Sequence, residues 1–204
     1  MTKDWEEIFS GISHHCGDIF VADYTQFAKE HGDCANKGVV ISDSVHSEIG
    51  SLIIHNPNKV KVLSVNFERN DKFFRVVEKE KCSTCECMFV ADGDSKKSWL
   101  VLVELKYCKG DDRNIQNNFD KAIEQLKSTF LYLRDTKKII GCGEYNYFWV
   151  VSMPEHSEKI PFMSFSFTQD AMLSYREDYG VTVIGDNELE IWTKNIIRPL
   201  SKRI

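Results

Sequence analysis

The chain has 204 residues, of which 42% are hydrophobic and 12% aromatic, and it carries a formal net charge of −5. This length predicts a single domain over residues 1–204, and the apolar content is sufficient to bury a core, which excludes an intrinsically disordered chain. No apolar run approaches the ~20 residues of a membrane-spanning helix, and the acidic start of the chain is unlike a signal peptide. We therefore expect a cytoplasmic protein without a membrane partner. Its seven cysteines are expected to be reduced thiols, because an odd number cannot fully pair.

The negative charge is concentrated near the N-terminus. Residues 1–50 hold nine acidic and three basic residues, whereas residues 51–204 hold 22 acidic and 23 basic ones. The carboxylates of an active site would be counted among those 22, so a locally positive groove stays compatible with the net charge. The charge balance therefore does not exclude nucleic acid as a partner.

The N-terminal part of the chain is predicted to be mostly helical. We expect a short helix over residues 4–9 with Thr2 as its cap, a second helix over 20–31, and a third over 44–55. The hydrophobic period then changes from helical to alternating. Residues 61–67 alternate as a strand does, and residues 73–78 are rich in aromatic and β-branched side chains.

The clearest pattern lies between residues 85 and 153. It predicts a strand over 86–91, a loop, a longer strand over 98–107, an amphipathic helix over 114–134 and a buried strand over 147–153. The C-terminal residues add a strand over 161–167, a short helix over 171–175, a strand over 181–184 and a closing helix over 187–197. These elements predict an α/β fold with a mixed central β-sheet flanked by helices.

Glu104 and Lys106 carry the strongest chemical signal. Side chains alternate along a strand, so the two residues share one face at the end of an apolar strand, where an unpaired charge is expensive to bury. A hairpin register that pairs Asp92 with Ser98 also pairs Glu86 with Glu104. Two carboxylates directly opposite each other repel unless a cation lies between them. A divalent metal would remove that repulsion, and the lysine ammonium could hold a water molecule or a phosphate oxygen.

An acidic residue on a strand, a turn, Glu104-Leu105-Lys106 on the next strand, a helical crossover and a buried strand together resemble the PD-(D/E)XK nuclease superfamily. The resemblance covers about residues 44–153. It implies a restriction-endonuclease-like core and a hydrolase that cuts phosphodiester bonds with magnesium or manganese. It also implies that Glu86 and Glu104 bind the metal and that Lys106 orients or activates the attacking water. Residues 1–43 would then be a helical N-terminal segment and residues 154–204 a C-terminal extension of strand and helix.

The same resemblance names further site residues. The helix before the sheet often supplies another carboxylate to the metal, and Glu48 is the matching candidate. The first acid is usually an aspartate after a proline, whereas this chain has Cys85-Glu86-Cys87. Asp92 and Asp94 are alternative first acids, but both lie at the tip of the hairpin, so Glu86 is preferred.

Nucleic acid, and DNA in particular, is the partner that this resemblance implies. The candidate phosphate contacts are Lys109 and Arg113 just past the site, with Lys121 on the following helix. Some members of the superfamily also place Gln and Tyr from this helix near the site, and Gln125 and Tyr132 are the candidates here, with Gln125 as a further contact to nucleic acid. A homodimer or a protein partner stays open.

Three other interpretations compete for the same residues. Glu104 and Lys106 could form an ordinary ion pair on a half-exposed strand. Cys82-Ser83-Thr84-Cys85 matches the spacing of a zinc knuckle, but Cys108 is the nearest further thiol and faces away, so we do not expect zinc. His14-His15-Cys16 could bind a metal, although a solvated turn is the preferred interpretation.

Two classes of function therefore follow from the sequence. The first is a metal-dependent nuclease in genome defence or DNA processing. The second is a nuclease-like protein that has lost catalysis and serves in interaction or regulation. The Cys-Glu pair in place of Pro-Asp and the acidic N-terminal part favour the second class more than they would in a standard member of the superfamily.

Overall fold

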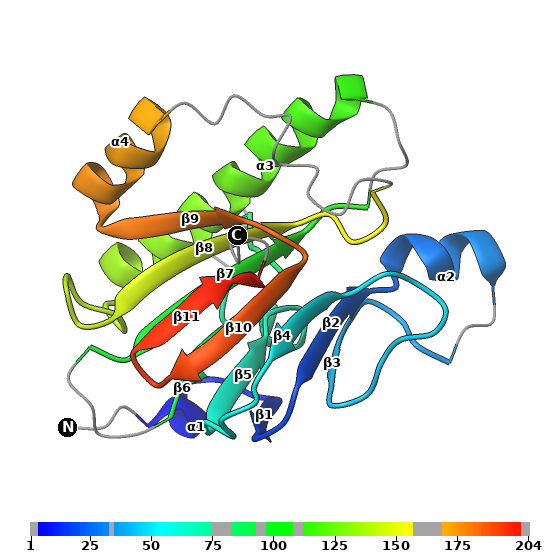
Figure 1. Ribbon diagram of the computed structural model, residues 1–204, viewed down its shortest axis with the longest axis horizontal. Helices are drawn as coiled ribbons and strands as arrows, with labels where there is room; N and C mark the ends of the chain where they lie inside the picture. The colour runs from blue at the N-terminus through cyan, green and yellow to red at the C-terminus, as the bar shows by residue number, and fades with distance from the viewer. Residues whose placement is uncertain are drawn as a thin grey trace.

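The computed structural model describes residues 4–32, 35–74, 83–92, 97–107, 112–156 and 169–200; the side chains of residues 112–114 and 169–171 are not described. The helices are α1 (Trp5–Ile8), α2 (Thr25–His31), α3 (Asp112–Leu131) and α4 (Gln169–Tyr179), with a 3-10 turn η1 (Glu68–Asn70) and a π-helical turn η2 (Tyr132–Thr136). The strands are β1 (Ile12–His15), β2 (Ile19–Asp23), β3 (Val39–Ser42), β4 (Leu52–His55), β5 (Val62–Asn66), β6 (Cys87–Ala91), β7 (Trp99–Leu105), β8 (Asn146–Ser152), β9 (Val181–Gly185), β10 (Glu188–Thr193) and β11 (Ile196–Pro199). They form two sheets (Figure 1).

The first sheet has six strands in the order β1-β5-β6-β7-β8-β9. Neighbours from β1 to β7 are antiparallel, whereas β7, β8 and β9 run parallel. A parallel pair needs a long crossover connection, and α3 connects β7 to β8. Its Phe119, Leu126 and Phe130 belong to the same buried core as Leu102 and Trp149 of the sheet. The predicted mixed sheet with a helical crossover is therefore confirmed.

The hairpin of β6 and β7 has the register that the sequence predicts. Phe89 lies opposite Val101, and Cys87 lies opposite Val103. The Glu86 amide also donates to the Val103 carbonyl at 3.0 Å. Val103 also pairs with Cys87, so two residues of one strand oppose one of the other and the regular ladder ends at Cys87. The predicted pairing of Glu86 with Glu104 is therefore not part of the observed register.

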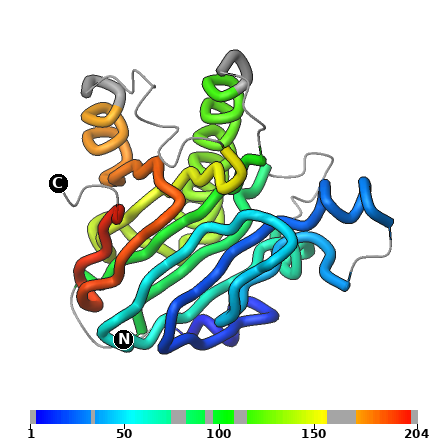
Figure 2. The backbone as a smooth tube through the Cα atoms, turned by 45° about the vertical axis from the view of Figure 1, so that its right-hand side comes forward, coloured from blue at the N-terminus to red at the C-terminus, as the bar shows by residue number. Residues whose placement is uncertain are grey.

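A second sheet, which the sequence analysis did not predict, covers the other face of the first. Its order is β11-β10-β4-β2-β3, with β10 parallel to β4 and the other pairs antiparallel. Leu52, Ile54 and Ile191 from this sheet share a buried core with Phe89 and Val101 from the first. Figures 1 and 2 show α3 and α4 on the opposite side of the six-stranded sheet. The fold is therefore α/β, with two mixed sheets flanked by helices.

Two predicted helices are wrong and a third, over 20–31, is confirmed only in its second half, because each includes residues that pair in the second sheet. Residues 44–51 are not helical and residues 52–55 are β4, with Leu52 and Ile54 buried and Ile53 half-exposed in the alternation of a strand. Residues 19–23 are β2, so α2 begins only at Thr25. The predicted closing helix is the hairpin of β10 and β11.

These corrections also change the description of the two ends of the chain. The N-terminal 43 residues contribute β1, β2 and β3 beside two short helices, so this segment is not a helical one. Asp4, not Thr2, caps α1, since its carboxylate accepts hydrogen bonds from the Glu6 and Glu7 amides. Thr2 and the predicted strand 161–167 lie outside the described residues, as does most of the predicted strand 73–78.

The packing of the second sheet predicts unequal effects for two neighbouring isoleucines of β4. Ile54→Ala should lower the free energy of unfolding by about 2–5 kcal/mol, because Ile54 is buried between the sheets. Ile53→Ala is the matched control and should cost less than half as much, since its side chain is half-exposed. Urea denaturation of both variants measures the difference. Equal losses would contradict the packing described here.

Candidate active site

Glu104 and Lys106 meet at the C-terminal end of β7, an interior strand of the six-stranded sheet. The Lys106 Nζ donates to the Glu104 Oε1 at 2.6 Å. The Glu104 side chain is 0% exposed, whereas that of Lys106 is 21% exposed. An exposed ion pair contributes little to stability, but a carboxylate buried this deeply carries a large desolvation cost. The two residues therefore do not form an ordinary surface ion pair.

Gln125 of α3 holds the same lysine from a second side. The Lys106 Nζ donates to the Gln125 Oε1 at 2.6 Å, and the Gln125 Nε2 donates to the Thr84 carbonyl at 3.1 Å. This chain of bonds fixes the ammonium group beside Glu104. The sequence analysis named Gln125 as a nucleic-acid contact, and the structure shows it as a partner of Lys106. Tyr132 lies elsewhere, with its hydroxyl bonded to the Phe73 carbonyl.

Both Glu86 and Glu104 are costly to ionise in this structure. Burial raises the pKa of Glu86 well above the usual range of a glutamate, and the Glu104 charge raises it further. Burial also raises the pKa of Glu104, although Lys106 partly offsets that effect. A buried carboxylate near a second one is costly to ionise unless a cation compensates its charge.

One carboxylate oxygen of this pair has no partner. Among the described residues, nothing forms a hydrogen bond with the buried Glu104 Oε2. An unsatisfied buried acceptor costs about 1–3 kcal/mol. Carboxylate oxygens are the ligands that magnesium prefers, so this oxygen and the Glu86 carboxylate suit a divalent cation in their chemistry. In the described part of the chain, however, no three His, Cys, Asp or Glu side chains are close enough to form a ready metal cage.

The structure does not bring the predicted third acid to this pair. Glu48 is exposed on the non-helical segment 44–51, and its charge acts on His46. It is not among the charges that act most strongly on Glu86 or Glu104. The prediction of Glu48 depended on a helix that does not form.

The remaining predicted residues fall in three places. Asp92 follows β6 at the end opposite to Glu86. Lys121 is exposed on α3, one turn before Gln125. Lys109, Asp94 and the side chain of Arg113 lie outside the described residues.

Two residues that the sequence analysis missed lie at the same edge. The Tyr107 hydroxyl accepts a hydrogen bond from the Asp23 amide at 3.0 Å and donates to the Gly50 carbonyl at 2.9 Å. A Cβ atom at Gly50 would lie 2.8 Å from the Pro154 carbonyl oxygen, so this close approach requires glycine. Asp23 ends β2, and its negative charge raises the pKa of both Glu86 and Glu104. No local sequence pattern predicts this position of Asp23, because it depends on how β2 pairs with distant strands of the second sheet.

The cysteine and histidine motifs do not form a metal site in the described residues. Cys85 and Cys87 are buried, and burial raises the pKa of each thiol well above its usual range, so both are neutral. Cys82 and Cys108 lie outside the described residues.

His14 and His15 lie on β1, so the predicted turn is wrong. Each ring nitrogen of His15 has a partner: Nδ1 is 2.6 Å from the Asp43 carboxylate, and Nε2 is 2.9 Å from the Ser64 hydroxyl. The three side chains repeat the order of a hydrolytic triad. Ser64 is only 1% exposed, so a substrate has no access to its hydroxyl.

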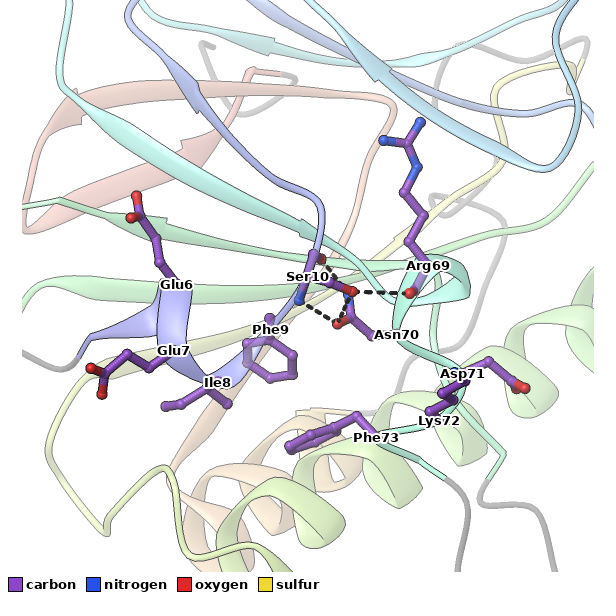
Figure 3. Close-up of a pocket in the computed structure, with 10 residues that line it drawn as sticks. All are labelled: Glu6, Glu7, Ile8, Phe9, Ser10, Arg69, Asn70, Asp71, Lys72 and Phe73. Carbon is purple, nitrogen blue, oxygen red and sulfur yellow. Dashed lines mark hydrogen bonds between the residues drawn. The ribbon is translucent and has the colours of Figure 1, made fainter.

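Two cavities lie near the end of β5. The first, of about 700 Å³, is shown in Figure 3 and is lined by residues 6–10 and 69–73. Its Ser10 and Asn70 side chains bond to each other, and none of the predicted site residues lines it. The second, of about 430 Å³, is lined by Phe67, Glu68, Asp71, Phe74 and Thr84. It therefore opens beside the Thr84–Gln125 contact of the candidate site.

No family model matches the chain, and neither the curated proteins nor the solved structures searched contain a match. Within the described residues, no helix is both long enough and apolar enough to cross a membrane. The functional interpretation therefore depends on the chemistry of the candidate site.

The raised pKa of Glu86 predicts an unusual response of stability to pH. Between the ordinary glutamate pKa and the raised one, the folded protein binds more protons than the unfolded chain, so the free energy of unfolding falls as pH rises. Glu86→Gln removes this ionisation. In chelator-treated protein at about pH 8, we expect the variant to be more stable than the wild type by about 1 kcal/mol or more, or about 2–4 °C in Tm. The gain should shrink towards about pH 5.

Thermal unfolding at the two pH values measures this effect. Glu48→Gln changes the same charge on an exposed side chain and should stay within about 0.5 kcal/mol of the wild type at both. A Glu86→Gln variant that is less stable than the wild type at about pH 8 would show that the two carboxylates do not oppose each other.

Proposed function

We propose that this chain is a metal-dependent nuclease with a restriction-endonuclease-like core of the PD-(D/E)XK type. The observation that carries the proposal is the buried Glu104 carboxylate, whose Oε2 has no partner among the described residues and whose charge acts on the buried Glu86. Magnesium or manganese bound by these two acids would satisfy that oxygen and cancel the repulsion. Magnesium keeps most of its own water ligands, so it can bind to two carboxylates. The absence of three clustered metal-binding side chains among the described residues is compatible with such a site.

The core proposed for the nuclease is the part of the sheet that surrounds this pair. It comprises the antiparallel strands β5, β6 and β7, the crossover helix α3 and the parallel strand β8. Glu86 directly precedes β6, and Glu104-Leu105-Lys106 spans the end of β7, so these residues lie at the same end of the hairpin. This arrangement supports the family assignment.

A bound divalent ion would polarise the scissile phosphate and lower the pKa of a bound water. The protein would contribute the position of Lys106. Glu104 and Gln125 use two of the three N–H donors of its ammonium group. The third is available for a phosphate oxygen or for the attacking water.

DNA is the substrate that we propose. Lys121 is exposed one turn from Gln125 on α3, where it could contact a phosphate of a strand bound at the site. Such contacts release counterions, so binding should weaken steeply with salt. Lys109 and Arg113 are proposed as further phosphate contacts on their sequence positions alone.

A catalytically inactive protein of interaction or regulation is the second candidate. One observation favours it: no three metal-binding side chains in the described residues form a ready cage. In such a protein, Glu86 and Glu104 would stay protonated and hydrogen-bonded, and the protein would not bind magnesium.

Cleavage assays with a lysine variant distinguish the two candidates. We expect the wild type to cut DNA with magnesium or manganese, and Lys106→Gln to lose at least about 100-fold in rate, because general acid–base and electrostatic groups contribute about that much. Glutamine retains a hydrogen-bond donor for the buried Glu104, which an alanine would leave unpaired.

Lys121→Gln serves as the matched control for this assay. It should weaken DNA binding and flatten its salt dependence while leaving the cleavage rate at saturating DNA within a few-fold of the wild type. Single- and double-stranded DNA and RNA should all be offered. Equal cleavage by the wild type and Lys106→Gln, or no cleavage of any substrate, would exclude the proposed nuclease.

A further inference from the structure

We propose that the outer face of the β10–β11 hairpin, coloured orange to red in Figure 1, binds single-stranded nucleic acid, with Trp192 as the ring on which a base stacks. This surface lies far from the candidate active site. The Lys194 carbonyl, in the turn of the hairpin, accepts from the amide of Trp99 at the start of β7, whereas Glu104 lies near the end of that strand. The two places are about 15–20 Å apart along β7. The surface therefore binds without metal and does not depend on the metal site proposed above.

A bulge in β10 turns Trp192 out to solvent. Ile191 lies opposite Ile197 and Thr193 lies opposite Ile196, so Trp192 is an extra residue between two paired ones. Trp192 is 48% exposed, whereas Ile191 and Ile197 belong to the core between the two sheets. The bulge thus directs the indole away from the core and onto the outer face of the second sheet.

Arg198 of β11 holds the exposed ring. Its guanidinium carbon lies 4.5 Å from the centre of the Trp192 ring, which is a cation–π contact. Glu190, the cross-strand partner of Arg198, accepts from its Nε at 3.0 Å and from its Nη2 at 2.8 Å. The Asn58 side chain donates to the Trp192 carbonyl at 2.9 Å. The indole ring and the guanidinium plane are therefore fixed beside each other before a ligand binds.

Lysines surround this ring on three segments that meet at the hairpin. Residues 57–61 join it through Asn58, and residues 97–99 join it because the Asn195 side chain donates to the Lys97 carbonyl at 3.0 Å. Together with residues 192–198, these segments contain no Asp or Glu. They carry four exposed lysines, Lys59, Lys61, Lys97 and Lys194. This part of the surface is therefore basic, although the chain as a whole has a net charge of −5.

Acidic side chains border the basic surface. Glu190 offsets the charge of Arg198. Asp92 adjoins Lys61, because its amide donates to the Lys61 carbonyl at 2.8 Å. Glu188 lies farther along β10, with its carboxylate 3.5 Å from the His55 Nε2. The basic residues outnumber these acids, so the surface around Trp192 attracts an anion.

An aromatic ring within a basic surface favours single-stranded nucleic acid over other anions. A base stacks on an indole ring or on a guanidinium plane, and the phosphates beside it bind to lysines. Glu190 takes two of the five N–H donors of Arg198, which leaves three for a phosphate oxygen. In a duplex, each base is already stacked on its neighbours and less accessible to the ring. A second copy of this chain, bound through the same face, would bring the lysines of both copies together, and these repel each other.

Tryptophan fluorescence tests the inference directly, because Trp192 is the exposed one of the four tryptophans of the chain. Trp5, Trp99 and Trp149 are 7%, 0% and 0% exposed. A short oligothymidylate, added to the full chain with a chelator present, should quench the emission, since a stacked base contacts Trp192. No binding, or no quenching once the anisotropy of a labelled strand shows that the protein is saturated, would overturn the inference.

The anisotropy of the labelled strand also compares variants. Trp192→Ala should weaken binding by about 5- to 100-fold, the loss typical of one base–aromatic stack, whereas Trp192→Tyr keeps a ring and should stay within a few-fold of the wild type. Leu173→Ala shortens an apolar side chain of α4 that is 53% exposed, and should bind as the wild type does. These side chains are exposed, so all three variants should fold, which thermal unfolding checks. Lys194→Gln should reduce the slope of log affinity against log salt by about 0.7.

Other ligands and a site variant distinguish the competing interpretations. Equally strong quenching by polyglutamate, or by vesicles that contain phosphatidylserine, would assign the surface to an acidic protein or to a membrane and would overturn the inference. Equal binding by the wild type and Trp192→Ala would place the strand elsewhere and would overturn it too. Lys106→Gln should show the same quenching as the wild type, whether or not the wild type cuts DNA. This surface and the proposed nuclease can therefore fail independently of each other.

Discussion

The burial of Glu104 close to the buried Glu86 is the constraint on which the interpretation of this structure depends. Among the described residues, Lys106 supplies an ammonium group within hydrogen-bond distance of Glu104, one of these two carboxylates. Hydrophobic strands and α3 exclude water from Glu104, so its charge cannot be solvated. The protein must therefore hold a proton on this pair or bind a cation there. A fold that served stability alone would gain by replacing such a pair with apolar residues.

The second sheet is hydrogen-bonded to the end of the β6–β7 hairpin at which the acidic residues lie. Tyr107, Asn66 and Glu68 each bond to backbone atoms at the end of β2 or the start of β3, so the two sheets are joined where the acids lie. Glu68 reaches the Val39 amide past Gly38, where any Cβ atom would clash with its carboxylate and φ is +66°. These bonds fix the acidic edge from outside the core that the sequence pattern outlines.

Local sequence patterns were sufficient for the hairpin but not for the second sheet. Alternation along β6 and β7, together with the length of their loop, fixed a register that the structure confirms from Cys87 to Val90. The second sheet pairs Ile53 with Glu188, residues far apart in the chain, and no local period records such a pairing. The same short apolar run of β4 suits a helix or a strand until its neighbours are known. Glu48 was consequently placed at the site and Asp23 was overlooked.

The central claim is that the Glu86–Glu104 pair holds protons that a divalent ion displaces. The most direct measurement is calorimetry of magnesium or manganese binding to the wild type at neutral pH, in two buffers with different ionisation enthalpies. Metal binding at this pair should release protons, so the observed heat should differ between the buffers, and the affinity should rise with pH. Binding without proton release, or no binding at any pH at which the protein is folded, would contradict the account.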